Sequence, residues 1–210
     1  MIKKLILVRH GQSTYNLENR FTGWKDVDLT ELGEKQAKEA GKILSNIKFD
    51  YCYISNLKRA KNTLQLILNE INQSPIIENN IALNERDYGD LIGQNKSEAA
   101  EKFGAEQVQI WRRSFDVPPP GGESLKMTAE RTLPYYKNTI LPKVLSSNNV
   151  IISAHGNSIR AIVMEIFNLT SSQILKTEIG WCEPWKITYN QDGSLAKYSI
   201  ISRPSEPSSS

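Results

Sequence analysis

Two short apolar segments, each followed directly by His-Gly, constrain the fold of this sequence most. Leu-Ile-Leu-Val-Arg precedes His10-Gly11, and Val-Ile-Ile-Ser-Ala precedes His155-Gly156. Such runs are typical of strands buried on both faces of a parallel sheet. Since His10 and His155 are the only histidines of the chain, both are predicted at the carboxyl end of a buried strand. Open α/β sheets bind their ligands at that edge.

Strand and helix patterns alternate along the rest of the chain. Further strands are predicted at 51–54 and 76–77, and a hairpin at 185–189 and 198–201. Helices are predicted at 30–46, from 55 or 56 to about 71, at 105–115, at 124–145 with a kink or break at its prolines, and at 157–167. The alternation predicts an α/β fold, a three-layer sandwich with a mostly parallel central sheet flanked by helices.

A polar, irregular stretch at about 83–122 interrupts this alternation. It is expected to form a cap over the carboxyl ends of the strands, and its 118–122 end is expected to be a surface loop. Residues 1–203 are predicted to form a single domain, which suits a chain of 210 residues. Residues 204–210 are rich in serine and proline and are predicted to be a disordered tail.

Composition excludes several classes of protein. A net charge of +3 without a dense Lys/Arg block argues against a nucleic-acid partner. The first apolar run is too short for a signal peptide or a membrane span, so no membrane association is expected. Cys52 and Cys182 match no metal-ligand spacing and imply no disulfide framework. These features favour a cytoplasmic protein.

The two histidines have three interpretations. They could be unrelated strand ends, which is the usual reading of a lone histidine, or a pair of metal ligands. Neither histidine carries the spacing that supplies partner ligands, so no metal is expected. The third interpretation is attack on phosphorus by an imidazole, in an anion pocket with Arg9, Arg59, Asn16 and Asn157 nearby. Each following glycine is expected to allow a sharp turn and to bring backbone N–H groups near the anion.

The residues around His10 match a known pattern. The pentapeptide Arg-His-Gly-Gln-Ser at 9–13 matches the Arg-His-Gly-x-Ser/Thr motif of the histidine phosphatase superfamily. Its continuation, Asn-Leu-Glu-Asn-Arg-Phe-Thr-Gly-Trp at 16–24, resembles the cofactor-dependent phosphoglycerate mutase branch of that superfamily. The similarity spans roughly residues 3–170 and includes segments 57–60, 83–89, 93–96, 109–113, 122–125 and 154–158.

The resemblance implies a role for each matching residue. His10 would become the phosphohistidine, His155 with Arg9 and Arg59 would grip the phosphoryl group, and Glu85 would be the general acid and base. The implied substrate-binding residues are Asn16, Thr22, Gly23, Arg86, Tyr88, Lys96, Arg112, Arg113, Gly156 and Asn157. Without the resemblance, the paired arginines would be interpreted as a solvated helix face, Glu85-Arg86 as a surface ion pair and Lys96 as a solvated loop residue.

The implied reaction interconverts 3-phosphoglycerate and 2-phosphoglycerate, with 2,3-bisphosphoglycerate as the priming cofactor and no metal. Its expected partners are small-molecule phosphoglycerates, and assembly with a second copy of the chain as a homo-oligomer stays open. Two alternatives stay open: a phosphatase in which water accepts the phosphoryl group, and a non-catalytic protein that binds a phosphorylated ligand. The chain departs from the family at Gly180-Trp-Cys-Glu-Pro184, where relatives often have Thr-Gly-x-Pro, so the wall of the site there is not assigned.

Overall fold

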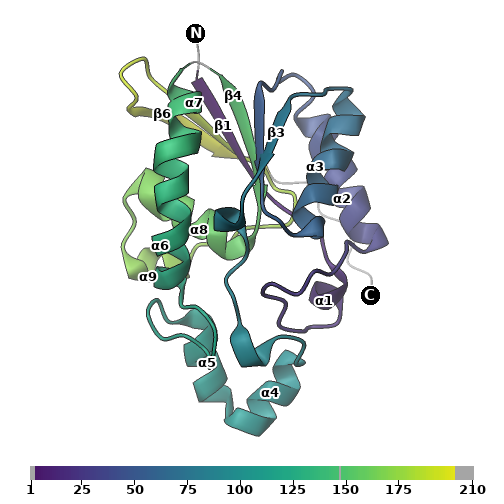
Figure 1. The fold of residues 1–210 in the computed structure, drawn as a ribbon, viewed down its shortest axis with the longest axis vertical. Helices are drawn as coiled ribbons and strands as arrows, with labels where there is room; N and C mark the ends of the chain where they lie inside the picture. The colour runs from purple at the N-terminus through teal and green to yellow at the C-terminus, as the bar shows by residue number, and fades with distance from the viewer. Residues whose placement is uncertain (1–2, 147, 202–210) are drawn as a thin grey trace.

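The computed structural model describes residues 3–146 and 148–201, whose strands form one six-stranded sheet in the order β3-β2-β4-β1-β5-β6 (Figure 1). The pairs β1–β4, β4–β2 and β2–β3 are parallel, whereas β5 pairs antiparallel with β1 and with β6. The mostly parallel sheet predicted from the sequence is therefore confirmed. The strands are β1 (Lys3–Arg9), β2 (Tyr51–Ile54), β3 (Ile76–Asn79), β4 (Asn149–Ala154), β5 (Trp185–Tyr189) and β6 (Leu195–Ile200).

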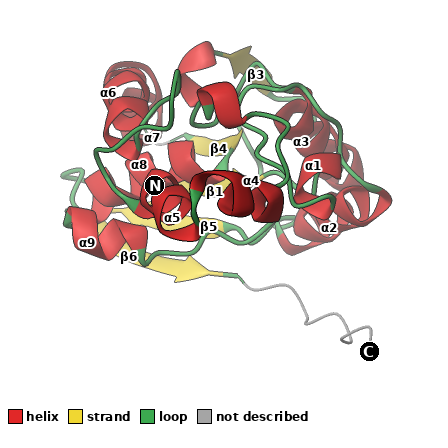
Figure 2. Cartoon of the chain, turned by 90° about the horizontal axis from the view of Figure 1, so that it is seen from below, coloured by secondary structure: helices red, strands yellow, loops and turns green. Residues whose placement is uncertain are grey.

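Helices cover both faces of the sheet, as Figure 2 shows from the end of the molecule. One face carries α2 (Glu31–Ile43) and α3 (Lys58–Ile71), and the other carries α6 (Leu125–Tyr135), α7 (Leu141–Leu145) and α8 (Gly156–Phe167). The short helix α9 (Ser171–Leu175) follows α8. None of the described helices is long and apolar enough to cross a membrane.

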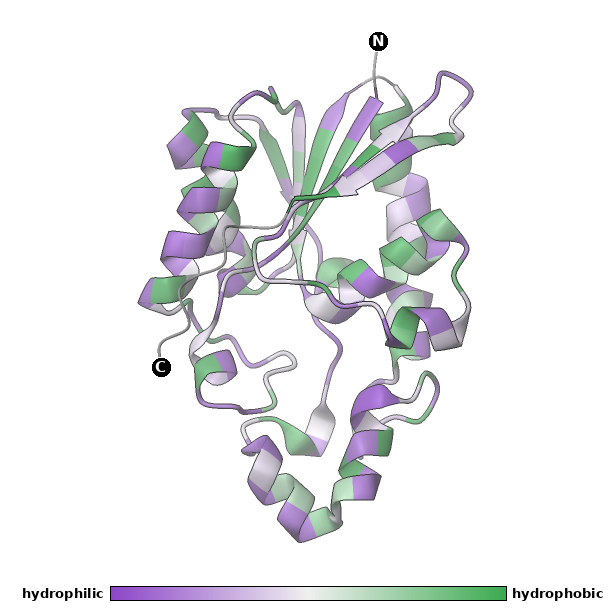
Figure 3. Ribbon diagram, turned by 180° about the vertical axis from the view of Figure 1, so that it is seen from behind, coloured by the Kyte–Doolittle hydropathy of each residue, from purple (hydrophilic) through white to green (hydrophobic). Residues whose placement is uncertain are grey.

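The central strands are apolar because they are buried on both sides, and Figure 3 shows them largely in the hydrophobic colour. Successive side chains of a strand point to opposite faces. Leu5 and Leu7 therefore pack in the cluster that contains α6 and α8, while Ile6 and Val8 pack in the cluster that contains α2 and α3. The short β1 run thus contributes to both cores at once.

The stretch at 83–122 lies at the end of the molecule toward which β1 runs (Figure 1). It contains η2 (Gly89–Leu91), α4 (Lys96–Phe103) and α5 (Ala105–Arg113), and η1 (Ile81–Leu83) leads into it. These elements have a small apolar cluster of their own, which Phe21 joins from the loop after α1 (Thr14–Leu17). The buried members of this cluster are Phe21, Leu91, Ala99 and Val108.

Several predicted boundaries shift in the structure. The helix expected from residue 55 or 56 begins at Lys58, because the Ser55 hydroxyl bonds a histidine and the Leu57 amide instead. The predicted 124–145 helix is interrupted by η3, one π-helical turn at Tyr136–Ile140, which begins two residues after Pro134. Three short helices, α1, α4 and α9, were not predicted, and the predicted disordered tail lies outside the described residues.

The glycine after the first histidine serves a different purpose from the one expected. Neither Gly11 nor Gly156 has a positive φ. A Cβ on Gly11 would lie 2.3 Å from the Gly33 carbonyl oxygen, and one on Gly33 would lie 2.1 Å from the Gln12 carbonyl oxygen. The loop after β1 and the first turn of α2 thus meet backbone to backbone, and glycine is required by this close approach.

Gly33→Ala is expected to destabilise the protein by about 2–3 kcal/mol, because the added methyl overlaps a backbone carbonyl that cannot move away. Helix propensity alone predicts the opposite sign, since alanine is favoured over glycine by about 1 kcal/mol within a helix. Urea unfolding measures the change. Lys38→Ala, an exposed position on the same helix, is the control and should stay within about 0.5 kcal/mol of the wild type. A Gly33→Ala protein as stable as the wild type would contradict this packing.

Candidate active site

The two histidines are brought together by strand pairing. In the parallel register of β1 and β4, Arg9 lies opposite Ala154, and the His10 amide donates to the Ala154 carbonyl over 3.1 Å. The residues that follow, His10 and His155, therefore leave neighbouring strands side by side. Their ring centroids are 5.1 Å apart and both side chains are buried. Each histidine lies at the carboxyl end of a buried strand, as predicted, and the structure adds that the two strands are neighbours.

The hydrogen bonds of His10 set its tautomer. Its Nδ1 lies 2.6 Å from the Gly11 carbonyl oxygen. A carbonyl can only accept, so Nδ1 carries the proton and Nε2 keeps a lone pair. Arg59 Nε donates toward that Nε2 over 3.4 Å. The imidazole therefore has the form that a nucleophile requires, with one nitrogen held and the other available.

Arg59 is held beside His10 by two backbone carbonyls and keeps further N–H groups for a ligand. Its Nη1 and Nη2 donate to the carbonyls of Lys25 and Gly23 over 2.9 and 2.8 Å. Burial lowers the pKa of Arg59 to about 10. These bonds fix the guanidinium against His10 and tie helix α3 to the loop after α1.

His155 is held from the opposite side of the ring pair. Its Nε2 lies 2.7 Å from Ser55 Oγ, which also accepts a bond from the Leu57 amide. Its Nδ1 is buried and has no hydrogen-bond partner among the residues that the structure describes, and the same is true of Arg9 Nε. A buried polar nitrogen without a partner is costly. Both atoms therefore mark positions where a bound anion would supply an acceptor.

A polar cavity of about 160 Å³ opens at this edge of the sheet. Most of the predicted substrate-binding residues line it, and they come from the end of β1, α1 and its following loop, the 83–122 segment and the start of α8. His10, His155 and Arg59 are buried and are not among its lining side chains. The predicted residues that line the cavity are Arg9, Asn16, Thr22, Gly23, Glu85, Tyr88, Lys96, Arg112, Arg113, Gly156 and Asn157.

Among the predicted substrate-binding residues, Arg86 alone is not part of the lining of this cavity. The structure does not bring it to this cavity, because its Nε donates to the Glu123 carbonyl over 2.6 Å and its Nη2 donates to the Trp111 carbonyl. The guanidinium also lies over the Tyr88 ring, 5.0 Å from the centroid. Arg86 therefore ties the start of the 83–122 segment to α5, farther along the same segment, and to the loop before α6.

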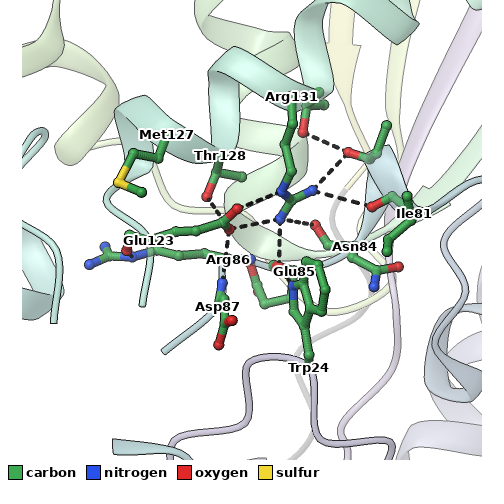
Figure 4. A network of polar contacts seen from close by, with 12 residues as sticks. Trp24, Ile81, Asn84, Glu85, Arg86, Asp87, Glu123, Met127, Thr128 and Arg131 are labelled. Atoms are coloured by element: carbon green, nitrogen blue, oxygen red, sulfur yellow. Dashed lines mark hydrogen bonds and ion pairs between the residues drawn. The ribbon is translucent and has the colours of Figure 1, made fainter. Parts of the chain in front are cut away.

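A network around Arg131 holds the main chain of Glu85 (Figure 4). Arg131 Nη2 and Trp24 Nε1 both donate to the Glu85 carbonyl, over 2.7 and 2.6 Å. Arg131 Nε also forms an ion pair with Glu123 at 2.8 Å. Burial raises the pKa of Glu123, but its bonds with Arg131, the Asp87 amide and Thr128 outweigh burial and lower it. The backbone of Glu85 is thus held on α6 by Arg131, whose guanidinium is itself ion-paired with Glu123.

The Glu85 carboxylate itself faces the cavity at its junction with α8. Its Oε1 accepts from the Asn157 amide over 3.1 Å and from the Arg86 amide over 2.7 Å. The Asn157 amide is one of the first amides of α8, which have no acceptor within the helix. The first turn of α8 therefore orients the carboxylate, and one helix connects Glu85 with His155.

Sequence reasoning missed two cations and one acid that line the cavity: Arg20, Arg160 and Glu178. Arg160 follows Asn157 by three residues on α8, and such positions share a helix face. That spacing was a usable signal for Arg160. Glu178 lies in the unassigned loop before β5, where the sequence carried no comparable signal.

Positive charge dominates the cavity. Its described lining has six cationic side chains, Arg9, Arg20, Lys96, Arg112, Arg113 and Arg160, against two carboxylates, Glu85 and Glu178. Burial and the neighbouring arginines lower the pKa of Lys96 to about 8. Within the described residues, no group of three or more His, Cys, Asp or Glu side chains could hold a metal ion. The cavity suits a ligand with more than one anionic group.

The histidines are expected to make stability depend on pH. Burial, followed by Arg59, lowers the pKa of both His10 and His155 well below 6.5. Below pH 6.5 the unfolded chain therefore binds protons that the folded protein excludes, so stability falls as the pH falls. Each histidine accounts for at most about 2 kcal/mol between pH 6.5 and 5. Urea unfolding across this range should show a smaller loss for His155→Gln than for the wild type, and equal losses would contradict the assignment.

Comparison with known proteins agrees with this geometry. Residues 5–199 match the family model of the histidine phosphatase superfamily (branch 1). A Nitrobacter hamburgensis protein named 2,3-bisphosphoglycerate-dependent phosphoglycerate mutase is 55% identical over 195 residues, which cover 91% of this chain and 94% of the relative. A Rhizobium meliloti protein of the same name is 52% identical over 200 residues, covering 94% and 95%.

Solved structures share the fold at lower identity. The Bacillus stearothermophilus protein YhfR superposes with a TM-score of 0.82 at 22% identity, covering 92% of this chain and 94% of that one. A mycobacterial glucosyl-3-phosphoglycerate phosphatase in complex with VO3 gives 0.81 at 23% identity, covering 97% and 100%. At these identities the likeness concerns the fold alone. On the family match and the close relatives together, this chain belongs to branch 1 of the histidine phosphatase superfamily.

Proposed function

We propose that this protein interconverts 3-phosphoglycerate and 2-phosphoglycerate through a phosphohistidine at His10, primed by 2,3-bisphosphoglycerate and without a metal. The observation that carries the proposal is the tautomer of His10, whose Nε2 keeps its lone pair directly after Arg9, one of the cations that line the cavity. Relatives that are 52–55% identical over more than 90% of the chain bear the corresponding name.

The first step forms a bond between His10 Nε2 and a phosphorus of 2,3-bisphosphoglycerate, while the bond from that phosphorus to the glycerate oxygen breaks. Charge builds on the three equatorial oxygens as the phosphoryl group passes across. Arg9, Arg59 and His155 are the donors proposed for these oxygens. The unpartnered nitrogens Arg9 Nε and His155 Nδ1 support this assignment. If Ser55 donates to His155 Nε2, then Nδ1 carries a proton to share with the phosphoryl group.

Glu85 is proposed as the general acid and base. In the first step its carboxyl proton goes to the departing glycerate oxygen. In the second step its carboxylate removes the proton from the accepting hydroxyl, whose oxygen attacks phospho-His10. Its carboxylate lines the cavity and is held by two backbone amides. Such fixed geometry suits proton transfer in a site that binds the glycerate in two orientations.

The remaining lining residues are proposed to bind the substrate. Asn16, Thr22, Gly23, Gly156 and Asn157 would surround the phosphoryl group near His10. Tyr88, Lys96, Arg112 and Arg113 would bind the carboxylate and the second phosphate from the 83–122 segment, which we propose acts as a cap of a single domain spanning residues 1–203. A simple phosphatase has less need of this second set, which favours the mutase over hydrolysis of general phosphomonoesters.

We also propose that the enzyme works in the cytoplasm. Cys52 and Cys182, the two cysteines of the chain, are buried thiols, as is usual in a reducing compartment. An assembly of identical chains is part of the same proposal and can be measured by light scattering.

Incubation with 32P-labelled 2,3-bisphosphoglycerate is expected to give an acid-labile, base-stable phosphoenzyme. The label should be absent in His10→Ala, because Nε2 is the proposed acceptor. A chase with unlabelled 3-phosphoglycerate should remove the label much faster than water does. Equal loss to water would favour the phosphatase, and ligand binding without any label would favour the non-catalytic alternative. Undiminished mutase turnover in His10→Ala would overturn the scheme.

Glu85→Gln is expected to lower mutase turnover by about 100-fold or more, since the amide keeps the shape of the side chain but cannot exchange a proton with the hydroxyl. The KM for 3-phosphoglycerate should change little. Steady-state kinetics measure both values, and circular dichroism checks the fold. A turnover number within about threefold of the wild type would exclude Glu85 as the acid and base.

A further inference from the structure

Arg160 is held in the cavity wall in a fixed orientation. Its Nε donates to the Thr177 carbonyl over 3.0 Å and its Nη1 donates to Asn157 Oδ1 over 3.2 Å. Its side chain is only 13% exposed. A Cβ built on Gly156 would lie 3.6 Å from Arg9 and 3.8 Å from Arg160. Both guanidinium groups therefore lie next to the first residue of α8, Arg9 coming from the end of β1 and Arg160 from the next turn of the helix.

Glu178 is an acid in this anion site for which the proposed reaction has no use. One carboxylate oxygen lies 3.6 Å from Arg160 Nη2 and the other lies 3.8 Å from Arg113 Nη1. Charge-assisted hydrogen bonds are usually 2.7–2.9 Å long, so both contacts are loose. The side chain is also 76% exposed. Glu178 is therefore a hydrated counter-ion that can leave at small cost.

The backbone on both sides of Glu178 is, by contrast, tightly held. The Thr177 carbonyl accepts from Arg160, and the Ile179 carbonyl accepts from Arg9 Nη1 over 2.8 Å. Two arginines of the site thus clamp the residues before and after Glu178. The backbone of Glu178 is therefore fixed beside the cavity, whereas its exposed carboxylate is only loosely bound.

We propose that Arg160 binds the anionic group of the substrate that lies remote from His10, and that Glu178 is an internal competitor which this group displaces. The inference rests on the proposed function, because it assumes a phosphoglycerate substrate. A ligand with two anionic groups replaces both loose contacts of Glu178 with Arg113 and Arg160. A phosphomonoester that lacks the second group cannot do so. Glu178 is in this way a specificity-determining residue that does not contact the reacting atoms.

Glu178→Gln is expected to tighten the binding of 3-phosphoglycerate about threefold, because a loose surface ion pair competes only weakly. Binding of glycerol 3-phosphate, which has a hydroxymethyl group in place of the carboxylate, should not change. Titration calorimetry on the unphosphorylated enzyme measures both dissociation constants in the absence of turnover. Arg160→Gln should weaken the binding of 3-phosphoglycerate about tenfold or more and should reduce the effect of the Glu178 substitution in the double variant.

Glu70→Gln is the matched control, since it removes the same charge from an exposed position on α3 and should leave both dissociation constants unchanged. A purely structural role for Glu178 predicts weaker binding on substitution, which is the opposite sign. Unchanged or weaker binding of 3-phosphoglycerate by Glu178→Gln, or an equal shift for both ligands, would overturn the inference. A wild-type protein that does not bind 3-phosphoglycerate would instead overturn the proposed function on which it rests.

Discussion

The parallel pairing of β1 with β4 is the contact on which the rest of this site depends. Its register places Arg9 opposite Ala154, so the next residue of each strand, His10 and His155, leaves the sheet at the same level. The two strands are central and their side chains enter both apolar clusters. Because a one-residue slip would reverse the faces of every side chain, the core itself fixes the distance between the histidines.

The arginines near the ring pair have two effects that share one physical cause. Together with burial, Arg59 and Arg9 lower the pKa of His10, so the imidazole stays neutral and keeps its lone pair near pH 7. The same positive charges stabilise negative charge on a transferring phosphoryl group. A site that favours anions therefore also favours a neutral nucleophile. The consequence is a lower free energy of unfolding at acid pH, because the histidines of the unfolded chain take up protons there.

The 83–122 segment is held in position mainly by hydrogen bonds to backbone carbonyl oxygens. Trp24, from the loop after α1, and Arg131, from α6, both donate to the carbonyl of Glu85. Arg86 and Arg59 also donate to carbonyls of other segments. Loops without regular structure have backbone groups that need partners, and here arginines supply them. The polar 83–122 segment is thereby attached to the elements around the sheet through charged side chains as well as through its small apolar cluster.

The sequence by itself determined the central strands, the longer helices and the type of chemistry. Apolar runs located the strands at 5–8, 51–54 and 150–154, and Thr30 and Ser124 marked helix starts, because these signals act between near neighbours. Only the tertiary structure decided that β1 lies beside β4, that Arg86 bonds carbonyls away from the cavity, and that Arg160 and Glu178 meet there. The direction of a long charged side chain depends on which acceptors the folded chain brings near it, and local sequence does not contain that information.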